Sequence, residues 1–334
     1  MKDMIRRILL LAAALMLAAG FSLPALAEEE EIPLEDLDLA DIETVNLETP
    51  LVANPLPIDF TAGYEPQESG YLDEYTYQDP TIQVKIEFKD VSEYGAMKGR
   101  TTGAWIADIR IGDASQLRTA AAESFEVNNA WQFEAIARPL HPVVACNGDY
   151  VTRLNEGFIL RQGILFKDKL KKKDGRDARD VLMIDENGDF HVFVRPGKGE
   201  LSETVDGKKV INAFYFGPVL VENGEVPDKM TSFTYLEPDD WFTRLAICQV
   251  GPLHYKIILT TNKQDSNLTS GLKMKDFARL CKDEGARTAF NLDGGYSTTL
   301  FFRGERVNAQ KHVNFREVPD IVYFASAWNG GDAE

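Results

Sequence analysis

Short segments in which apolar and polar residues alternate recur along residues 81–328. TIQVKIEF (residues 81–88) and AWIADIRI (104–111) each place apolar side chains at every second position. This period of two is typical of strands with one face in a core. Asn-Gly pairs at 187–188 and 223–224 separate further apolar segments and predict hairpin turns. The chain is therefore expected to be rich in strands.

Two segments have helical features. LKMKDFARLCKDE (272–284) gathers apolar residues on one side and is followed by Gly285, which suits a left-handed C-terminal position. GDASQLRTAAAES (112–124) is predicted to begin a helix with Asp113 as N-cap. The other expected strands are 143–146, 244–250 paired with 254–261, 288–292 and 320–326. We therefore expect an α+β domain, with a few helices packed on a mixed or antiparallel sheet.

The N-terminal residues 1–27 have the features of a secretory signal peptide. Lys2, Arg6 and Arg7 precede the apolar run ILLLAAALMLAAG, and Ala25-Leu26-Ala27 offers a cleavage site. An uncleaved membrane anchor is the alternative, but the run is short for a span. No Cys follows it, so we expect no lipid anchor. The mature protein is expected to begin at Glu28, without a stable membrane anchor, and to be secreted or extracytoplasmic.

Charge and composition divide the rest of the chain. The formal net charge is −17, which disfavours nucleic acid as a partner. Residues 28–80 are acidic, contain several prolines and are expected to be a largely disordered or extended spacer. Alternatively, this segment packs on the domain as an extended arm. Residues 81–328 are long enough for one large domain, and 329–334 form a short tail.

The cysteines and histidines predict no metal, cofactor or disulfide framework. Three cysteines, Cys146, Cys248 and Cys281, lie in apolar contexts and are expected to be small buried hydrophobes with at most one bridge. The four histidines are scattered without metal-ligand spacing. The basic run KDKLKKKDGRDARD (167–180) is expected to be a solvated loop, although it could also meet an anionic polymer.

Two polar clusters follow apolar strands. In AFNLDGGYSTTLFF (289–302), Asp293 stands at a strand end, and Gly294 and Gly295 permit positive φ and close approach to backbone amides. A simple β-turn is the alternative. In HPVVACNGDYV (141–151), the strand 143–146 delivers Asn147, Gly148 and Asp149 in the same way. Polar clusters at the ends of buried strands are where rigid scaffolds usually present function.

The order of several segments resembles the phosphodiester glycosidase family, which includes the enzyme that uncovers mannose 6-phosphate on lysosomal hydrolases. The segments are WIADIRIGDASQLRTA, ACNGDYV, GFILRQGILF, FYFGPVLVENGEV, the Arg244 position, NLDGGYST and REVPDIVYF. Together they cover about residues 100–326. Individually these motifs are weak, but their joint order is specific.

This resemblance implies hydrolysis between the anomeric carbon of a sugar and a phosphodiester oxygen. Asp293 and Asp149 would be the carboxylates on the sugar side, and Arg244 would clamp the phosphate through its planar fork. The residues implied to bind hydroxyl groups and phosphate oxygens, or to shape their site, are Asn147, Gly148, Asn291, Gly294, Gly295, Tyr296, Ser297 and Thr298. All four residues Arg244, Asn147, Asp149 and Asp293 are expected to converge on one pocket.

The chain departs from the family pattern at two places that bear on the expected hydrolytic activity. Thr261-Asn262-Lys263 stands where the family usually has Asp-Gly-Arg, and Tyr296 stands at the third glycine of the signature. We therefore expect an exported bacterial hydrolase acting on sugar-1-phosphodiester linkages in envelope or extracellular glycopolymers. The alternative is a non-catalytic module on the same fold that binds such glycans.

Overall fold

The computed structural model describes residues 50–150, 152, 154–170, 177–233, 236, 238–261, 271–308 and 315–331. The predicted signal peptide, residues 28–49 and the departure at Asn262-Lys263 lie outside these residues. Contacts divide the chain into two units, residues 1–49 and 50–334, and only the second is described below. None of its described helices is long and apolar enough to cross a membrane.

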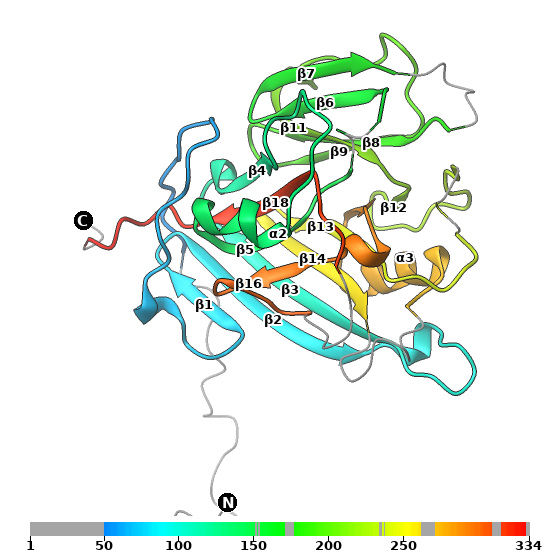
Figure 1. Ribbon diagram of the computed structural model, residues 1–334, viewed down its shortest axis with the longest axis horizontal. Coiled ribbons are helices and arrows are strands. Elements are labelled where there is room, and N and C mark those ends of the chain that lie inside the picture. Colours follow the sequence, from blue (N-terminus) through cyan, green and yellow to red (C-terminus); the bar gives the residue numbers. More distant parts are fainter. Residues whose placement is uncertain are drawn as a thin grey trace, which may run out of the picture. The chain divides into compact units, whose positions relative to one another are not determined.

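Three antiparallel sheets dominate the described part of the chain (Figure 1). The seven-stranded sheet has the order β1 (Thr76–Asp79), β2 (Ile82–Asp90), β3 (Gly103–Ile111), β14 (His254–Thr261), β13 (Leu245–Gly251), β15 (Thr288–Leu292) and β12 (Val219–Val221). The six-stranded sheet has the order β7 (Ile164–Lys169), β6 (Gly157–Arg161), β11 (Lys208–Phe216), β8 (Asp180–Asp185) and β9 (Phe190–Phe193), with β10 (Thr204–Val205) on β11. The five-stranded sheet has the order β17 (Glu305–Arg306), β16 (Leu300–Phe302), β5 (Pro142–Asn147), β18 (Asp320–Ala325) and β4 (Leu117–Ala121). The predicted strand-rich α+β class is confirmed.

Within the described residues the helices are few and short. The α-helices are α2 (Phe133–Ala137) and α3 (Met274–Asp283), and single 3-10 turns are η2 (Glu68–Gly70), η3 (Ser92–Tyr94), η4 (Ala114–Gln116), η5 (Arg138–Leu140) and η8 (Gly295–Ser297). As the sequence predicted, α3 ends before Gly285, whose φ is +88°. The helix predicted after Asp113 is wrong. Asp113 does cap a turn, but that turn is η4, and the chain then enters β4 because Leu117–Ala121 pairs with β18.

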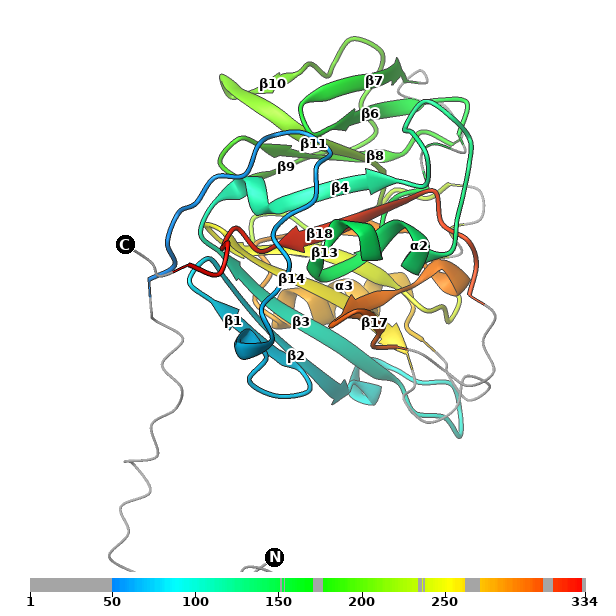
Figure 2. The same ribbon diagram turned by 60° about the vertical axis from the view of Figure 1, so that its left-hand side comes forward.

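The five-stranded sheet is the middle layer. In Figure 2 its strands β4 and β18 run between β8 of the six-stranded sheet and β14 of the seven-stranded sheet. Its strands β5 and β18 are buried along their whole length, which fits the expected central position of 143–146. One hydrophobic core lies against the seven-stranded sheet, and this core includes Cys146, Cys248 and Cys281. All three cysteines are buried and free, as small apolar side chains would be. α2 packs through Phe133 and Ile136 on the opposite face of the five-stranded sheet, the face turned away from that core.

Residues 50–80 pack on the domain, so the extended-arm alternative describes this part of the expected spacer. Leu56 is buried, and its N–H donates to the Ser115 hydroxyl at 2.7 Å. The buried guanidinium of Arg118 donates to the carbonyl oxygens of Pro57 and Thr61 at 2.9 and 3.0 Å. β1 then adds a strand to the large sheet. The folded unit therefore begins near residue 50 rather than at residue 81.

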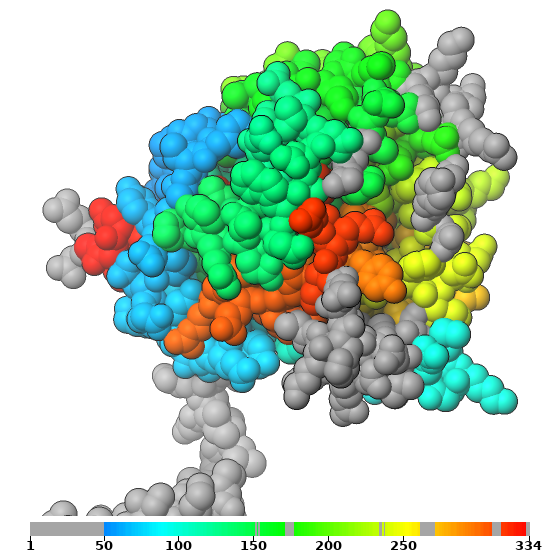
Figure 3. All heavy atoms as spheres, viewed as in Figure 1, coloured from blue at the N-terminus to red at the C-terminus, as the bar shows by residue number. Residues whose placement is uncertain are grey.

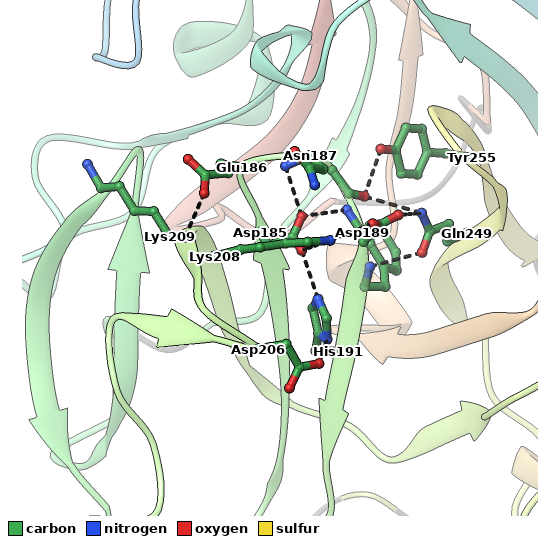
Figure 4. A network of polar contacts seen from close by, with 12 residues as sticks. Asp185, Glu186, Asn187, Asp189, His191, Asp206, Lys208, Lys209, Gln249 and Tyr255 are labelled. Atoms are coloured by element: carbon green, nitrogen blue, oxygen red, sulfur yellow. Dashed lines mark hydrogen bonds and ion pairs between the residues drawn. The ribbon is translucent and has the colours of Figure 1, made fainter.

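A polar network joins the six-stranded sheet to the seven-stranded sheet (Figure 4). The fully buried carboxylate of Asp185 at the end of β8 contacts His191 Nε2 at 3.0 Å and Lys208 Nζ at 3.1 Å. Asp189 accepts from Gln249 Nε2 of β13 at 3.1 Å. Burial alone would raise the pKa of Asp185, but hydrogen bonds from His191 and Lys208 hold it below its ordinary value.

Asp185→Asn is expected to lower the free energy of unfolding by about 2–4 kcal/mol, because it leaves a buried set of donors without their charged acceptor. A folded-state pKa below the unfolded value means that this stabilisation is lost as the pH falls through that lower pKa. Denaturant unfolding at neutral pH measures the effect. Asp206→Asn is the control, since Asp206 is exposed and lies 3.7 Å from His191. If Asp185→Asn and Asp206→Asn have equal free energies of unfolding, Asp185 does not stabilise the fold in this way.

Candidate functional site

A pocket of about 430 Å³ opens where strand ends from the sheets meet. Its lining includes Asn291 and Leu292 of β15, Phe216 of β11, Arg179 just before β8, Arg244 just before β13, and Arg316 ahead of β18. Such a volume is within the range of about 300–1,000 Å³ typical of small-ligand sites. Figure 3 shows atoms from the middle of the chain and from its C-terminal part side by side on one face. The pocket thus gathers residues that are far apart in sequence.

Asp293 follows β15 and is one of the residues that line the pocket. Its N–H donates to Gly148 O at 3.2 Å, and its carbonyl accepts from Asn147 Nδ2 at 2.8 Å. Burial raises the pKa of Asp293 to about 6, although Ser297, Arg316 and Arg179 act in the opposite direction. The carboxylate is therefore mostly ionised at neutral pH and takes up a proton as the solution becomes mildly acidic.

Arg179 supplies a cation to the inner part of the pocket. Its guanidinium lies over the rings of Phe233 and Phe216, 4.1 and 5.1 Å from their centroids. Its buried Nη1 has no hydrogen-bond partner among the described residues. Burial lowers the pKa of Arg179, while the charges of Asp149 and Asp293 act against that shift. A buried donor of this kind is available to an anionic ligand.

Arg316 supplies a second cation, at the exposed edge of the pocket. Its backbone N–H donates to Tyr296 O at 3.0 Å. The sequence analysis assigned neither cation to the site. Arg179 lies in the basic run that was predicted to be a solvated loop. Arg316 lies in a segment that was compared only with the closing strand of the family. One signal was present, since Arg179 directly precedes an apolar strand, as Arg244 does.

Arg244 lines the pocket, but its donors serve the protein. Nε donates to Leu272 O, Nη1 to Leu236 O and Nη2 to Asp240 O, at 3.1, 3.1 and 3.0 Å. At least three of the five guanidinium donors are therefore engaged by backbone carbonyls. This geometry fits a residue that fixes the loop around 236–240 rather than the predicted phosphate clamp.

Asp149 is fully buried and is not among the residues that line the pocket, although its charge acts on Asp293. The fully buried Oδ2 accepts from Tyr215 N at 2.7 Å and pairs with Arg161 Nη2 at 3.0 Å. Arg161 also reaches Asp320 Oδ2 at 3.5 Å. Burial and the neighbouring charge of Asp149 raise the pKa of Asp320 well above its ordinary value, so the pair holds a proton at neutral pH. The placement favours a structural role for Asp149 over the predicted sugar-side role.

Close packing explains Gly148 and Gly294, and a positive φ explains Gly295. A Cβ on Gly148 would lie 2.2 Å from the Asp320 carboxylate, and one on Gly294 would lie 2.6 Å from Thr243 O. Gly295 has a φ of +60°, and its N–H donates to Thr243 O at 2.8 Å. The Gly295 amide is therefore used by the protein, although Gly294 and Gly295 both line the pocket.

The remaining predicted residues divide between the pocket and the structure behind it. Asn291 and Tyr296 line the pocket, and Asn291 Oδ1 has no hydrogen-bond partner among the described residues. Asn147 accepts from Thr299 N at 3.0 Å while it holds Asp293, so it orients the loop. Ser297 and Thr298 are buried and are not part of the lining. The predicted convergence thus brings Asp293 and Arg244 into the pocket, with Asn147 and Asp149 beside it.

Tyr296 does not fill the pocket. Its side chain is 65% exposed, and the volume of about 430 Å³ is present with the tyrosine in place. The other aromatic lining residues are Tyr150, Phe216, Phe233 and Phe242. One carboxylate, two available guanidinium groups and several aromatic rings suit a ligand that combines an anion with a ring.

Comparisons with known proteins give the family of the chain and its fold. No curated protein matches the chain by sequence. The catalytic domain of zebrafish N-acetylglucosamine-1-phosphodiester alpha-N-acetylglucosaminidase, solved in a form auto-inhibited by its pro-peptide, shares the fold with a TM-score of 0.58 and 15% identity, over 79% of this chain and 87% of that one. A hypothetical protein from Synechocystis aligns with a TM-score of 0.47 and 15% identity, over 73% and 62%. The family model for phosphodiester glycosidase matches residues 141–325, more than half of the chain. The chain therefore belongs to the phosphodiester glycosidase family.

Proposed function

We propose that this protein hydrolyses sugar-1-phosphodiester linkages in envelope or extracellular glycopolymers. The observation that carries the proposal is the position of Asp293, whose pKa is raised to about 6, in one pocket with Arg179 and Arg316. A carboxylate beside cations matches a substrate whose sugar becomes positive while its phosphate leaves with negative charge. Family membership supports the same chemistry.

In this reaction the bond between the anomeric carbon and the phosphodiester oxygen breaks, and water supplies the new anomeric hydroxyl. The ionised Asp293 stabilises the oxocarbenium-like ring, as nucleophile or as the base that activates water. Arg179 and Arg316 bind the phosphate oxygens. Because a phosphate is a good leaving group, strong acid assistance is less needed than for an ordinary glycoside. One carboxylate in the pocket is therefore sufficient for the step in which the phosphate departs.

The surrounding residues fit supporting roles. Phe216 and Phe233 add apolar surface to the pocket beside the Arg179 guanidinium that lies over them, and Asn291 Oδ1 offers an acceptor to a sugar hydroxyl. Asn147 holds the Asp293 backbone. Arg244 fixes the neighbouring loop by donating hydrogen bonds to the backbone carbonyls of Leu236 and Asp240. These contacts keep the reacting groups in place, which is what preorganised electrostatic stabilisation requires.

The test is release of phosphomonoester from a panel of sugar-1-phosphodiesters that differ in sugar and anomer. Turnover of at least one member, with saturation in substrate, supports the proposal. Binding without turnover across the panel would favour the glycan-binding alternative, in which the pocket holds phosphoglycans but does not cleave them.

Export belongs to the same proposal, because its substrates lie outside the cytoplasm. The basic residues, the apolar run and Ala25-Leu26-Ala27 support removal of residues 1–27. N-terminal sequencing of secreted protein is expected to begin at Glu28. A sequence that begins at Met1 in secreted material would contradict cleavage.

A further inference from the structure

Two of the three cysteines lie where α3 packs on the seven-stranded sheet. Cys248 belongs to β13 and Cys281 to α3, and both side chains are fully buried in one hydrophobic core. Cys146 shares this core but belongs to β5 of the five-stranded sheet. None of the three lines the pocket. The pair at α3 is therefore separate from the proposed hydrolytic chemistry.

An ion pair at the end of α3 shows that Cys248 and Cys281 face each other. Cys248 is directly opposite Lys256 of β14 in the antiparallel register, so the two side chains project from the same face of the sheet. Lys256 Nζ contacts Glu284 Oε2 at 3.0 Å. Glu284 caps α3 and follows Cys281 by three positions, which places both on one side of the helix. That side of α3 therefore meets Lys256 and Cys248 together.

Backbone hydrogen bonds also hold the end of α3 against β13. Arg287 N donates to Gln249 O at 2.9 Å, next to Cys248 in the strand, and Ala286 N donates to Cys281 O at 3.1 Å. Burial raises the pKa of the Cys281 thiol, and a hydrogen bond with the Cys248 thiol raises it further. Two thiols in hydrogen-bond contact, carried by elements fixed in this way, can be joined without a large backbone movement.

We propose that Cys248 and Cys281 form a disulfide that joins α3 to β13 when the chain folds in contact with a low-molecular-weight disulfide. One cysteine attacks this oxidant as its thiolate and releases one thiol, and the second cysteine then attacks the mixed disulfide and releases the other. The two cysteines together give up two protons and two electrons, which reduce one oxidant disulfide to two thiols. Burial keeps Cys281 protonated in the folded protein, so the exchange takes place before α3 has packed.

The bond would stabilise the protein mainly by restricting its unfolded chain. It closes a loop from residue 248 to residue 281, and a loop of this length loses much of its freedom when its ends are joined. Disulfides persist in oxidising surroundings and are reduced in most cytoplasms. The state of this pair therefore also reports where the chain folded.

The experiment unfolds the full chain with reductant and refolds it in two buffers, one with reduced glutathione alone and one that also contains oxidised glutathione as the probe. All three thiols are expected to titrate after refolding with reduced glutathione, whereas one of the three should titrate after oxidative refolding. Peptide mapping is expected to find residues 248 and 281 linked. The oxidised form is expected to melt about 5–10 °C above the reduced form.

Cys146→Ala is the matched control, since Cys146 is equally buried but its strand pairs with β16 and β18. This variant is expected to keep the difference in melting temperature between the two buffers. Cys248→Ala and Cys281→Ala are each expected to lose that difference and to keep two free thiols. Each variant is compared with itself in the two buffers, so a loss of stability caused by the substitution does not affect the result.

Other outcomes overturn the proposal. Three free thiols after oxidative refolding, glutathione attached singly to Cys248 or Cys281, or a bond that includes Cys146 would each contradict the pairing. A lower melting temperature of the oxidised form would show that the bond strains the packing of α3 and does not belong to the native fold. None of these readouts requires hydrolytic activity, so failure of this proposal and failure of the proposed function are separate results.

Discussion

The Asp293→Asn protein is expected to fold normally and to hydrolyse a sugar-1-phosphodiester roughly a hundred- to a thousandfold more slowly than wild type, or slower still if Asp293 is the nucleophile. The amide keeps the size of the carboxylate but removes the charge that stabilises the developing sugar cation. Burial raises the pKa of Asp293, so its ionised form is disfavoured by folding. Removing that charge should therefore leave the melting temperature at or above the wild-type value.

The pH profile of the wild-type enzyme is a second readout of the same prediction. Because the ionised form is required, kcat/KM should fall as the pH drops through about 6, where Asp293 takes up its proton. Asp206→Asn, which removes an exposed carboxylate, should leave rate and profile unchanged. An Asp293→Asn protein that melts normally and turns over like wild type would exclude this residue from the mechanism.

Arg179→Met is expected to lower activity strongly without lowering stability. Methionine replaces the apolar stem against Phe216 and Phe233 but removes the cation, so kcat/KM is expected to fall roughly a hundredfold or more. Stability should hold or rise, because the buried Nη1 has no hydrogen-bond partner among the described residues and burying its charge opposes folding. Hydrolysis kinetics and melting temperature measure the two effects.

Arg303→Met is the control for that variant. Arg303 lies over Tyr71 and pairs with Glu68 at the surface. The Arg303→Met change therefore removes a comparable cation–π contact outside the pocket. A loss of stability in Arg179→Met with unchanged kcat/KM would make Arg179 a packing residue. Weaker inhibition by inorganic phosphate in Arg179→Met, but not in Arg303→Met, would assign its charge to the leaving group.

Much of the fold follows from local patterns. Strands 288–292 and 320–326 and the hairpin at Asn187-Gly188 were predicted, because alternation, apolar runs and turn residues act over a few positions. The segment after Asp113 was mispredicted for a non-local reason: Leu117–Ala121 completes a sheet with β18, about 200 residues away. Sheet pairing at that distance overrides the local preference for helix.

The site was predictable in position but not in detail. Asp293, Gly294 and Asn291 stand at a strand end, and the structure places all three on the pocket. No sequence pattern distinguishes a carboxylate that faces a pocket from one that faces an arginine behind it, which is the difference between Asp293 and Asp149. The same holds for cations: Arg244 donates to backbone carbonyls, whereas Arg179 Nη1 has no hydrogen-bond partner among the described residues, and only the packing of distant loops decides this.

The buried group of Asp149, Asp320 and Arg161 has a consequence for how relatives of this protein are recognised. Gly148 must lack a side chain to admit the Asp320 carboxylate, and Asp149 must accept from β11, whether or not any substrate is turned over. A descendant chain that lost Asp293 would keep the same packing requirement at Gly148 and the same buried hydrogen bond at Asp149. That segment therefore marks shared architecture, and under the proposed function a survey that separates working enzymes from silent relatives should sort them by residues 293, 179 and 316 instead.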